Sequence, residues 1–418
     1  MIKVRKLKNG VRMVMDEIPY VQSVSMGIWV RAGARDEQPK LSGVSHFIEH
    51  MMFKGTEKRS AKDIAEDAER IAGQMNAFTG KEATCYYMKT LSSNAEKGAE
   101  LLLDMFVNSK FDSREMSKEK QVIIEEMKMS KDSPEDDVHD TICETVFKGN
   151  PLANSILGTA TSLKGITRNM LKKYIEDEYT KDNIVVAVAG NFDEESLAEI
   201  FERELSSFKE SKTVKKYTEV PHKPSYRVHV KDIEQCNLCL GTRGVALDSE
   251  DYYAFSILNH IIGGSMASRL FQNIREEKGL AYSVYSMSSS FSDMGYFNIY
   301  AGVSHDKIEA AITGIGEELA GLKKNFVTAD EFAIAKEQMK GSYIFGQENV
   351  NGKMFSAGKN LLIMNKTFTP EEVIKGVDDV TMEDLERVAE KIWDIKNYSA
   401  VAAVKEKINL RRIMERQG

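Results

Sequence analysis

The sequence predicts an α+β fold made of two homologous α/β-sandwich domains, each a mostly antiparallel sheet packed against helices. Two observations predict this fold: strand-like segments occur in clusters among helical ones, and the second half of the chain repeats features of the first. Strand-like segments include 11–16, 23–32, 84–91 and 184–190, and long helical patterns cover roughly 60–75, 94–108, 113–132 and 166–178.

A polar and basic stretch separates the two halves. Residues 208–226, FKESKTVKKYTEVPHKPSY, lack helical periodicity and contain two of the seven prolines. Each half also ends with a strand-like run, NIVVAVAG in the first and NYSAVAAV in the second. We therefore predict one domain at 1–210, a linker at 211–225 and a second domain at 226–418.

A constant shift of 212 residues aligns the halves. The matched pairs are Arg31 with Arg243, Ala34 with Ala246, Asp36 with Asp248, Glu119 with Glu331, Glu125 with Glu337, Met127 with Met339 and Lys128 with Lys340. Because one offset holds from the first strands to a late helix, the sequence predicts an internal duplication.

Length, charge and hydropathy restrict the class of protein. A chain of 418 residues allows about two to three domains. A net charge of −7 argues against nucleic acid or an anionic membrane surface as the main partner. No apolar run approaches the roughly 18 to 20 residues that span a bilayer, and the N-terminus alternates like a first strand. We expect a cytoplasmic protein, and a removed transit peptide remains open.

The four cysteines favour a reducing compartment, because so few in a long chain do not make a disulfide scaffold. Cys236 and Cys239 form a C-x-x-C pair within QCNLCLGTRG. No second pair follows, and the segment is typical of a strand. A redox or zinc-knuckle role for this pair is the alternative.

The run GVSHFIEHMMFKGT places His46, Glu49 and His50 in an otherwise apolar helix. Positions i and i+4 share a helix face, so the two imidazoles can bind one cation with the glutamate beside them. A catalytic zinc takes about three protein ligands and a water, whose pKa it lowers to about 7. Satisfied core histidines are the alternative interpretation.

The internal repeat helps to decide between a metal site and satisfied core histidines. The shift of 212 carries the three polar residues onto aliphatic ones, Leu258, Ile261 and Ile262. A helix in this position therefore packs without histidines, and the polar side chains of the first half are an addition to it. This contrast favours a metal site in the first domain and a metal-free second domain.

HFIEH followed by MMFKGT, and later AGQMNAFTGKEATCYY, resembles the inverted zinc-protease family that includes pitrilysin, insulysin and the mitochondrial processing peptidases. The resemblance implies a third zinc ligand on a later helix, which Glu126 matches, and a supporting glutamate, which Glu119 matches. At the shift of 212, Glu126 corresponds to Gln338 in the second half, whereas Glu125 corresponds to Glu337. This contrast favours Glu126 as the functional residue. A solvated acidic helix face is the alternative.

The same resemblance implies where a peptide binds. MNAFTGKEATCYYMKTL predicts a turn followed by a strand, to which an extended peptide could add through main-chain hydrogen bonds. The family places Asn76 and Ala77 beside the substrate backbone, and we include the adjacent Phe78. A plain turn role for Asn76 remains open.

In the second half, GGSMASRLFQNIREEKGLAYSVYS resembles the family's C-terminal module, in which an arginine and a tyrosine seven apart reach an active site. Arg275 and Tyr282 have that spacing. Tyr282 could stabilise the oxyanion and Arg275 a substrate carbonyl. Arg269 is expected to form a structural salt bridge, and a solvated surface role is the alternative for Arg275.

These inferences predict a zinc metalloendopeptidase with one Zn²⁺ per chain, held by His46, His50 and Glu126. Its catalytic residues would be Glu49 as general base, Glu119, Arg275 and Tyr282. Because the chain matches the shorter family members, we expect a homodimer in which Arg275 and Tyr282 serve the partner's site. The substrates would be peptides or extended unfolded segments, for processing or degradation. The alternative is a non-catalytic scaffold like the respiratory-complex core subunits.

Overall fold

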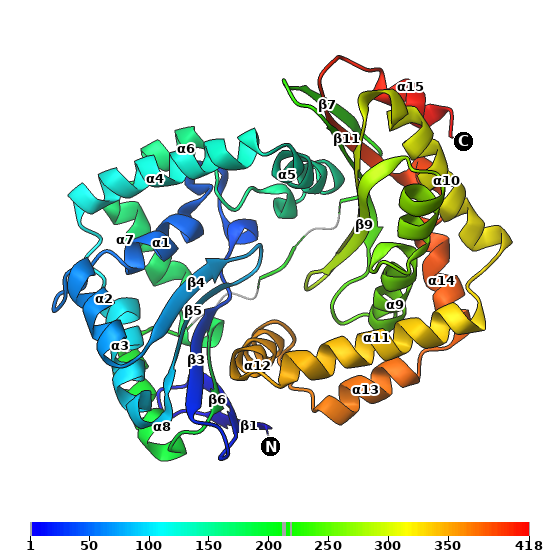
Figure 1. The fold of residues 1–418 in the computed structure, drawn as a ribbon. Coiled ribbons are helices and arrows are strands. Elements are labelled where there is room, and N and C mark those ends of the chain that lie inside the picture. Colours follow the sequence, from blue (N-terminus) through cyan, green and yellow to red (C-terminus); the bar gives the residue numbers. More distant parts are fainter. Residues whose placement is uncertain (1, 211–214, 218–219, 418) are drawn as a thin grey trace. The chain divides into compact units, whose positions relative to one another are not determined.

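The computed structural model describes residues 2–210, 215–217 and 220–417 of the chain, which divides into two compact units (Figure 1). The first unit comprises Met1–Met127, Asn154–Lys216 and Ile344–Thr369, and the second comprises Lys128–Ala153, Tyr217–Tyr343 and Pro370–Gly418. Part of the predicted linker 211–225, namely 211–214 and 218–219, lies outside the described residues.

The units differ from the contiguous domains predicted at 1–210 and 226–418. Residues 128–153 belong to the second unit and residues 344–369 to the first. Each exchanged segment carries a helix that packs on a sheet built by the other half of the chain. Periodicity within a helix identifies the helix but does not say which sheet it covers, so the sequence did not predict this exchange.

The sheet of the first unit has the strand order β1-β2-β6-β3-β5-β4, which leaves β4 at one edge. Its strands are β1 (Ile2–Lys6), β2 (Arg12–Glu17), β3 (Ser23–Val30), β4 (Gln74–Thr79), β5 (Thr84–Leu91) and β6 (Ile184–Gly190). β2 pairs with β6 in parallel and the other neighbours pair antiparallel. Every residue of β6 is buried, as expected for a strand covered on both faces.

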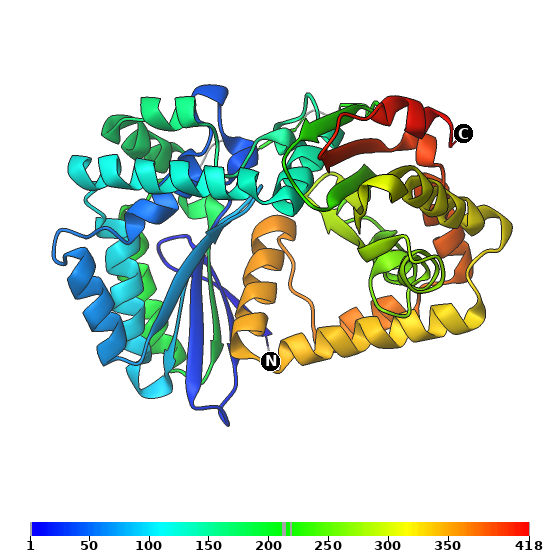
Figure 2. The ribbon, with the colours of Figure 1, turned by 45° about the horizontal axis from the view of Figure 1, so that its top comes forward.

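Helices cover both faces of this sheet. On one face, α1 (Val44–Met52) and α3 (Ala95–Asn108) contact β5, and their apolar side chains form the larger core. On the other face, α12 (Val350–Met364, orange in Figures 1 and 2) lies against β3 and β6. A Cβ at Gly358 would lie 2.2 Å from Nε1 of Trp29, so glycine permits this close approach.

The remaining helices of the first unit are α2 (Ala61–Arg70), most of α4 (Ser113–Asp132), α6 (Ala160–Gly165), α7 (Arg168–Glu178) and α8 (Glu194–Glu204). α2 ends earlier than the helix predicted at 60–75. Ala72 takes a left-handed φ of 51°, and Gly73 N donates to Ala68 O at 2.7 Å, which closes the helix. The chain then enters β4, so Asn76 lies in a strand and not in the predicted turn.

The second unit repeats this plan, with strand order β7-β11-β8-β10-β9. Its strands are β7 (Tyr226–Val230), β8 (Cys236–Gly244), β9 (Ala281–Ser290), β10 (Gly295–Val303) and β11 (Ser399–Val404). Its helices are α5 (Pro134–Val146), α9 (Tyr252–Gly263), α10 (Ile308–Lys324), most of α11 (Ala329–Gln347), α13 (Pro370–Asp378), α14 (Met382–Ile392) and α15 (Leu410–Glu415). α5 packs on β8 and β11, as α12 packs on β3 and β6. The predicted α+β class with mostly antiparallel sheets is confirmed.

Cys236 and Cys239 lie in β8, as the strand interpretation expected, and both are buried. Burial raises the pKa of the Cys236 thiol to about 11 and raises that of Cys239 further above its ordinary value. Thiols of this kind are protonated and unreactive near neutral pH, which argues against the redox alternative. Separately, the described residues contain no helix with the length and apolar character needed to cross a membrane.

Candidate metal centre

Two of the candidate metal ligands lie on α1, and a buried carboxylate caps the N-terminus of this helix. Glu37 accepts hydrogen bonds from Gly43 N at 2.6 Å and from Ser45 N at 2.8 Å. These amides belong to the first turn, where backbone N–H groups have no partner within the helix. Burial raises the pKa of Glu37 to about 8, although the hydrogen bonds from Ser45 and Gly43 act to lower it. The cap fixes where the helix starts.

Three side chains converge on one point in the first unit. His46 and His50 lie on α1, and Glu126 lies on α4. Glu126 Oε2 is 3.8 Å from Nε2 of His46 and 3.8 Å from Nε2 of His50. One donor atom from each residue lies within 4.8 Å of the others, and these three form a possible metal-binding group in the described part of the chain.

This donor set fits a zinc ion. Two imidazole nitrogens and one carboxylate oxygen are the ligands of one common type of catalytic zinc site, which keeps a fourth position for water. Burial lowers the pKa of His46 to about 4, so its ring is neutral near pH 7 and has a lone pair to offer. The Glu126 side chain is 45% exposed, which leaves this side of the cluster accessible to solvent.

Glu119 lies behind His50 instead of facing the donor cluster. Its Oε2 is 3.0 Å from His50 Nδ1, and its Oε1 is 2.7 Å from Lys54 Nζ. Against the raising effect of burial, the hydrogen bonds from Lys54 and His50 lower the pKa of Glu119. An ionised Glu119 holds the proton of His50 on Nδ1 and leaves Nε2 free to bind a metal. The structure therefore supports a positioning role for Glu119.

Glu49 points from α1 toward β4, where the hydroxyl of Thr79 donates a hydrogen bond to its Oε2. Burial raises the pKa of Glu49, and the Thr79 hydrogen bond and the nearby His50 lower it in part. Sequence reasoning did not single out Thr79. The available signal was strand alternation, since Thr79 lies two residues after Ala77 on the same face of β4.

The predicted substrate-binding residues lie on β4, at the edge of the sheet. Asn76 is exposed, and its Oδ1 accepts a hydrogen bond from Ala77 N at 2.8 Å. Phe78 packs edge-on against Trp29 and Phe355, with ring centroids 5.5 and 5.7 Å apart. Its ring therefore belongs to the aromatic cluster beside α12. Ala77 and Thr79 alternate with Phe78 along β4, so their side chains lie on the opposite face of the strand, which is the face toward α1.

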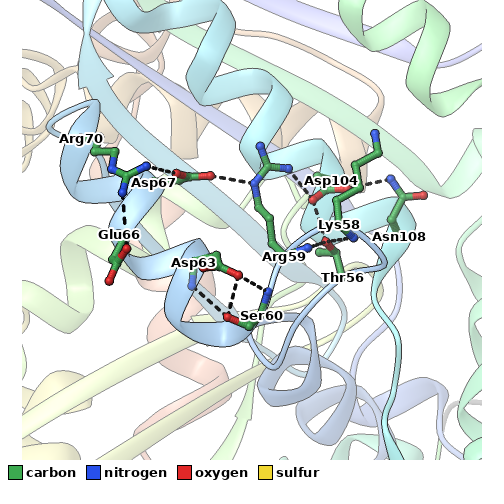
Figure 3. Close-up of polar contacts among 10 residues, drawn as sticks. All are labelled: Thr56, Lys58, Arg59, Ser60, Asp63, Glu66, Asp67, Arg70, Asp104 and Asn108. Carbon is green, nitrogen blue, oxygen red and sulfur yellow. Dashed lines mark hydrogen bonds and ion pairs between the residues drawn. The ribbon is translucent and has the colours of Figure 1, made fainter.

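The segment that follows α1 is pinned to α2 and α3 by polar side chains (Figure 3). Buried Asp104 on α3 accepts hydrogen bonds from Thr56 Oγ1 at 2.8 Å and from Arg59 at 2.7 Å. Arg59 also donates to Asp67 on α2 at 2.9 Å. These contacts fix the C-terminal end of α1 without involving any of the three metal donors.

Arg275 and Tyr282 belong to the second unit, whereas the metal donors belong to the first. Arg275 lies in a π-helical segment, Phe271–Glu277, and its guanidinium is 5.7 Å from the centre of the Tyr282 ring. Tyr282 is the second residue of β9 and is 77% exposed. Arg269 forms a bidentate ion pair with Glu331, at 2.6 and 2.8 Å, as the structural interpretation of Arg269 expected.

Comparison with known proteins gives consistent matches over nearly the whole chain. A family model described as "Insulinase (Peptidase family M16)" matches residues 12–160, and one described as "Peptidase M16 inactive domain" matches residues 165–339. A Bacillus subtilis protein named "Uncharacterized zinc protease YmxG" is 42% identical, over 94% of this chain and 96% of its own length.

Two solved structures share the fold. The "peptidase M16 inactive domain" structure from Pseudomonas fluorescens has a TM-score of 0.91 at 20% identity and covers 97% of this chain and 98% of its own. A chain of Complex III2 from Candida albicans has a TM-score of 0.84 at 19% identity and covers 100% of both chains. At such identities these similarities establish the fold alone.

Proposed function

The chain belongs to peptidase family M16, the inverted zinc-protease family that its motifs resemble, and we propose on this premise that it is a zinc metalloendopeptidase. The observation that carries the proposal is the convergence of His46, His50 and Glu126 from two helices onto one point. We propose one Zn²⁺ per chain, bound by these three side chains.

The residues around the donors have the chemistry that amide hydrolysis requires. A bound zinc would supply electrophilic assistance and lower the pKa of a water to about 7. Glu49 takes the proton from the attacking water and delivers it to the leaving amine nitrogen. Its burial supports this role, because a raised carboxyl pKa brings the group closer to the working pH of a general base. Glu119 keeps His50 oriented throughout.

The substrates we propose are peptides and extended unfolded segments. β4 is an edge strand, and its free edge can pair with an extended peptide through main-chain hydrogen bonds. Asn76, Ala77 and Phe78 would line that added strand. A folded protein offers few such segments, so the enzyme would act on flexible chains, for processing or for degradation.

We further propose a homodimer in which Arg275 and Tyr282 act at the partner's metal centre. Tyr282 is exposed, and the guanidinium of Arg275 lies over its ring, so the pair presents a phenol and a cation on one surface. The phenol would donate to the oxyanion and the guanidinium to a substrate carbonyl. Sites exchanged in this way are equivalent about a two-fold axis.

The rival function is a non-catalytic scaffold, since a chain of Complex III2 shares the fold. The donor set favours the peptidase, because a scaffold has no need of two histidines and a glutamate around one point. Replacing Glu49 by Gln should lower the cleavage of a quenched-fluorescence peptide by at least about 100-fold and leave the zinc content unchanged. A wild-type rate in this variant, or no cleavage by the zinc-loaded wild type, would contradict the proposal.

A further inference from the structure

We propose that Thr79 is a positioning residue that orients the carboxylate of Glu49 for proton transfer. This inference rests on the proposed function and adds a residue to it. Thr79 Oγ1 donates to Glu49 Oε2, which leaves Oε1 as the oxygen available to accept a proton from water. A glutamate side chain has three rotatable bonds, so a fixed donor on one oxygen restricts the direction of the other.

Thr79 is itself held firmly by its position in the sheet. It is the last residue of β4 and pairs in register with Thr84 of β5. The turn that follows is closed by Gly80 N, which donates to Ala83 O at 2.8 Å. The hydroxyl therefore projects from a paired strand at the start of a tight turn, and not from a mobile loop.

One short segment, residues 33–37, clamps this turn. Ala34 N donates to Gly80 O at 3.2 Å, and Arg35 N donates to Lys81 O at 2.8 Å. A Cβ at Gly33 would lie 2.5 Å from Gly80 O, so the two backbones are in direct contact. A buried ion pair of 2.6 Å joins Arg35 to Glu82, the third residue of the turn.

The same segment also holds the helix that carries the base. Glu37, at its end, accepts from Gly43 N and Ser45 N at the start of α1. Residues 33–37 thus fix both the turn that follows Thr79 and the helix that presents Glu49. Because both partners are attached to one segment, their hydrogen bond is set by the fold before any substrate binds, which is the condition for an efficient proton transfer.

The position of Thr79 also connects the base to the substrate. Thr79 lies on the edge strand to which we propose a peptide adds, two residues from Ala77. A peptide in register with β4 is therefore aligned by the same strand that aligns Glu49. The competing interpretation is that Thr79 is an ordinary strand residue whose hydroxyl finds the nearest acceptor.

Three variants of the full-length, zinc-loaded protein separate these interpretations. Thr79→Val removes the hydroxyl and keeps the branched shape, and Thr79→Ser keeps the hydroxyl. Thr84→Val is the matched control, because buried Thr84 faces Thr79 across the hairpin and donates instead to Ala32 O at 2.9 Å. For each variant, kcat, KM, zinc content and melting temperature are measured with one quenched peptide.

We expect Thr79→Val to lower kcat by about 10- to 100-fold with KM and zinc content unchanged, as a misdirected catalytic group does. Thr79→Ser should restore most of kcat, and Thr84→Val should lower the melting temperature without a comparable loss of kcat. Thr79→Val with kcat within twofold of wild type, or an equal loss in Thr84→Val, would overturn the role of Thr79 and leave the peptidase intact. An inactive wild type with full zinc would overturn the peptidase and this role together.

Discussion

His50 and Glu119 are joined by a 3.0 Å hydrogen bond between the ring Nδ1 and the carboxylate Oε2. The duplication places Glu331 at the equivalent position of the second half, where its two oxygens accept from Arg269. A glutamate on the duplicated helix thus holds a nitrogen donor in both halves. In the first half that donor is His50, a candidate metal ligand, so the contact with Glu119 orients a ligand. In the second half the contact between Glu331 and Arg269 is an ion pair with no metal ligand involved.

Replacing Glu119 by Gln should weaken zinc binding by about 10- to 100-fold, because a neutral amide orients His50 less strongly than a carboxylate does. Zinc affinity is measured by competition with a chelator. Glu115→Gln is the control, since Glu115 lies on the same helix but pairs with Lys118 at the surface. Equal affinities in Glu119→Gln and wild type would show that Glu119 does not support the site.

Removing zinc should lower the stability of the wild-type protein. An ion that binds only the folded state adds about 2.7 kcal/mol to the free energy of unfolding when its free concentration is a hundred times its dissociation constant. Calorimetry with zinc and with a chelator measures the difference. Glu126→Ala should reduce it strongly by removing one of three ligands. If the melting temperature of the wild type is the same with zinc and with a chelator, the result would contradict a zinc site.

The ion pair between Arg269 and Glu331 predicts a pH dependence. The hydrogen bond from Arg269 lowers the pKa of Glu331 to about 2, from an ordinary value near 4.5. A carboxyl with a depressed folded-state pKa stabilises the protein above its unfolded-state pKa, and this stabilisation is lost as the pH falls from about 4.5 toward 2. The free energies of unfolding of wild type and Glu331→Gln, measured with urea, should therefore converge as the pH falls from about 4.5 toward 2. A difference that does not change with pH would contradict the assignment.

Gly358→Ala should destabilise the first unit by roughly 1 to 3 kcal/mol, because the added methyl would overlap the indole of Trp29 where α12 meets the sheet. Gly321→Ala is the matched control. Gly321 lies on α10 with no atom within 4 Å of an added Cβ, so the change should be neutral or stabilising by up to about 1 kcal/mol. Chemical denaturation compares the two, and equal effects would mean that α12 is not packed this closely.

Much of the local structure followed from the sequence. The strand predicted at 84–91 is Thr84–Leu91, and the helix predicted at 113–132 is Ser113–Asp132. The helix predicted at 60–75 was too long, because a left-handed Ala72 ends it at Arg70. Side-chain periodicity continued past that point, and a backbone conformation that the periodicity does not encode stopped the helix.

Periodicity and motif spacing by themselves determined which residues share a helix face, and so they brought His46, Glu49 and His50 together. Packing between segments far apart in the chain decided the rest: that Glu126 meets the two imidazoles, that Glu119 lies behind His50, that Thr79 reaches Glu49, and that residues 128–153 and 344–369 exchange units. The physical reason is the separation in sequence between the residues that make contact. A helical repeat fixes neighbours within a few residues, whereas contacts across 30 to 80 positions depend on how whole elements pack.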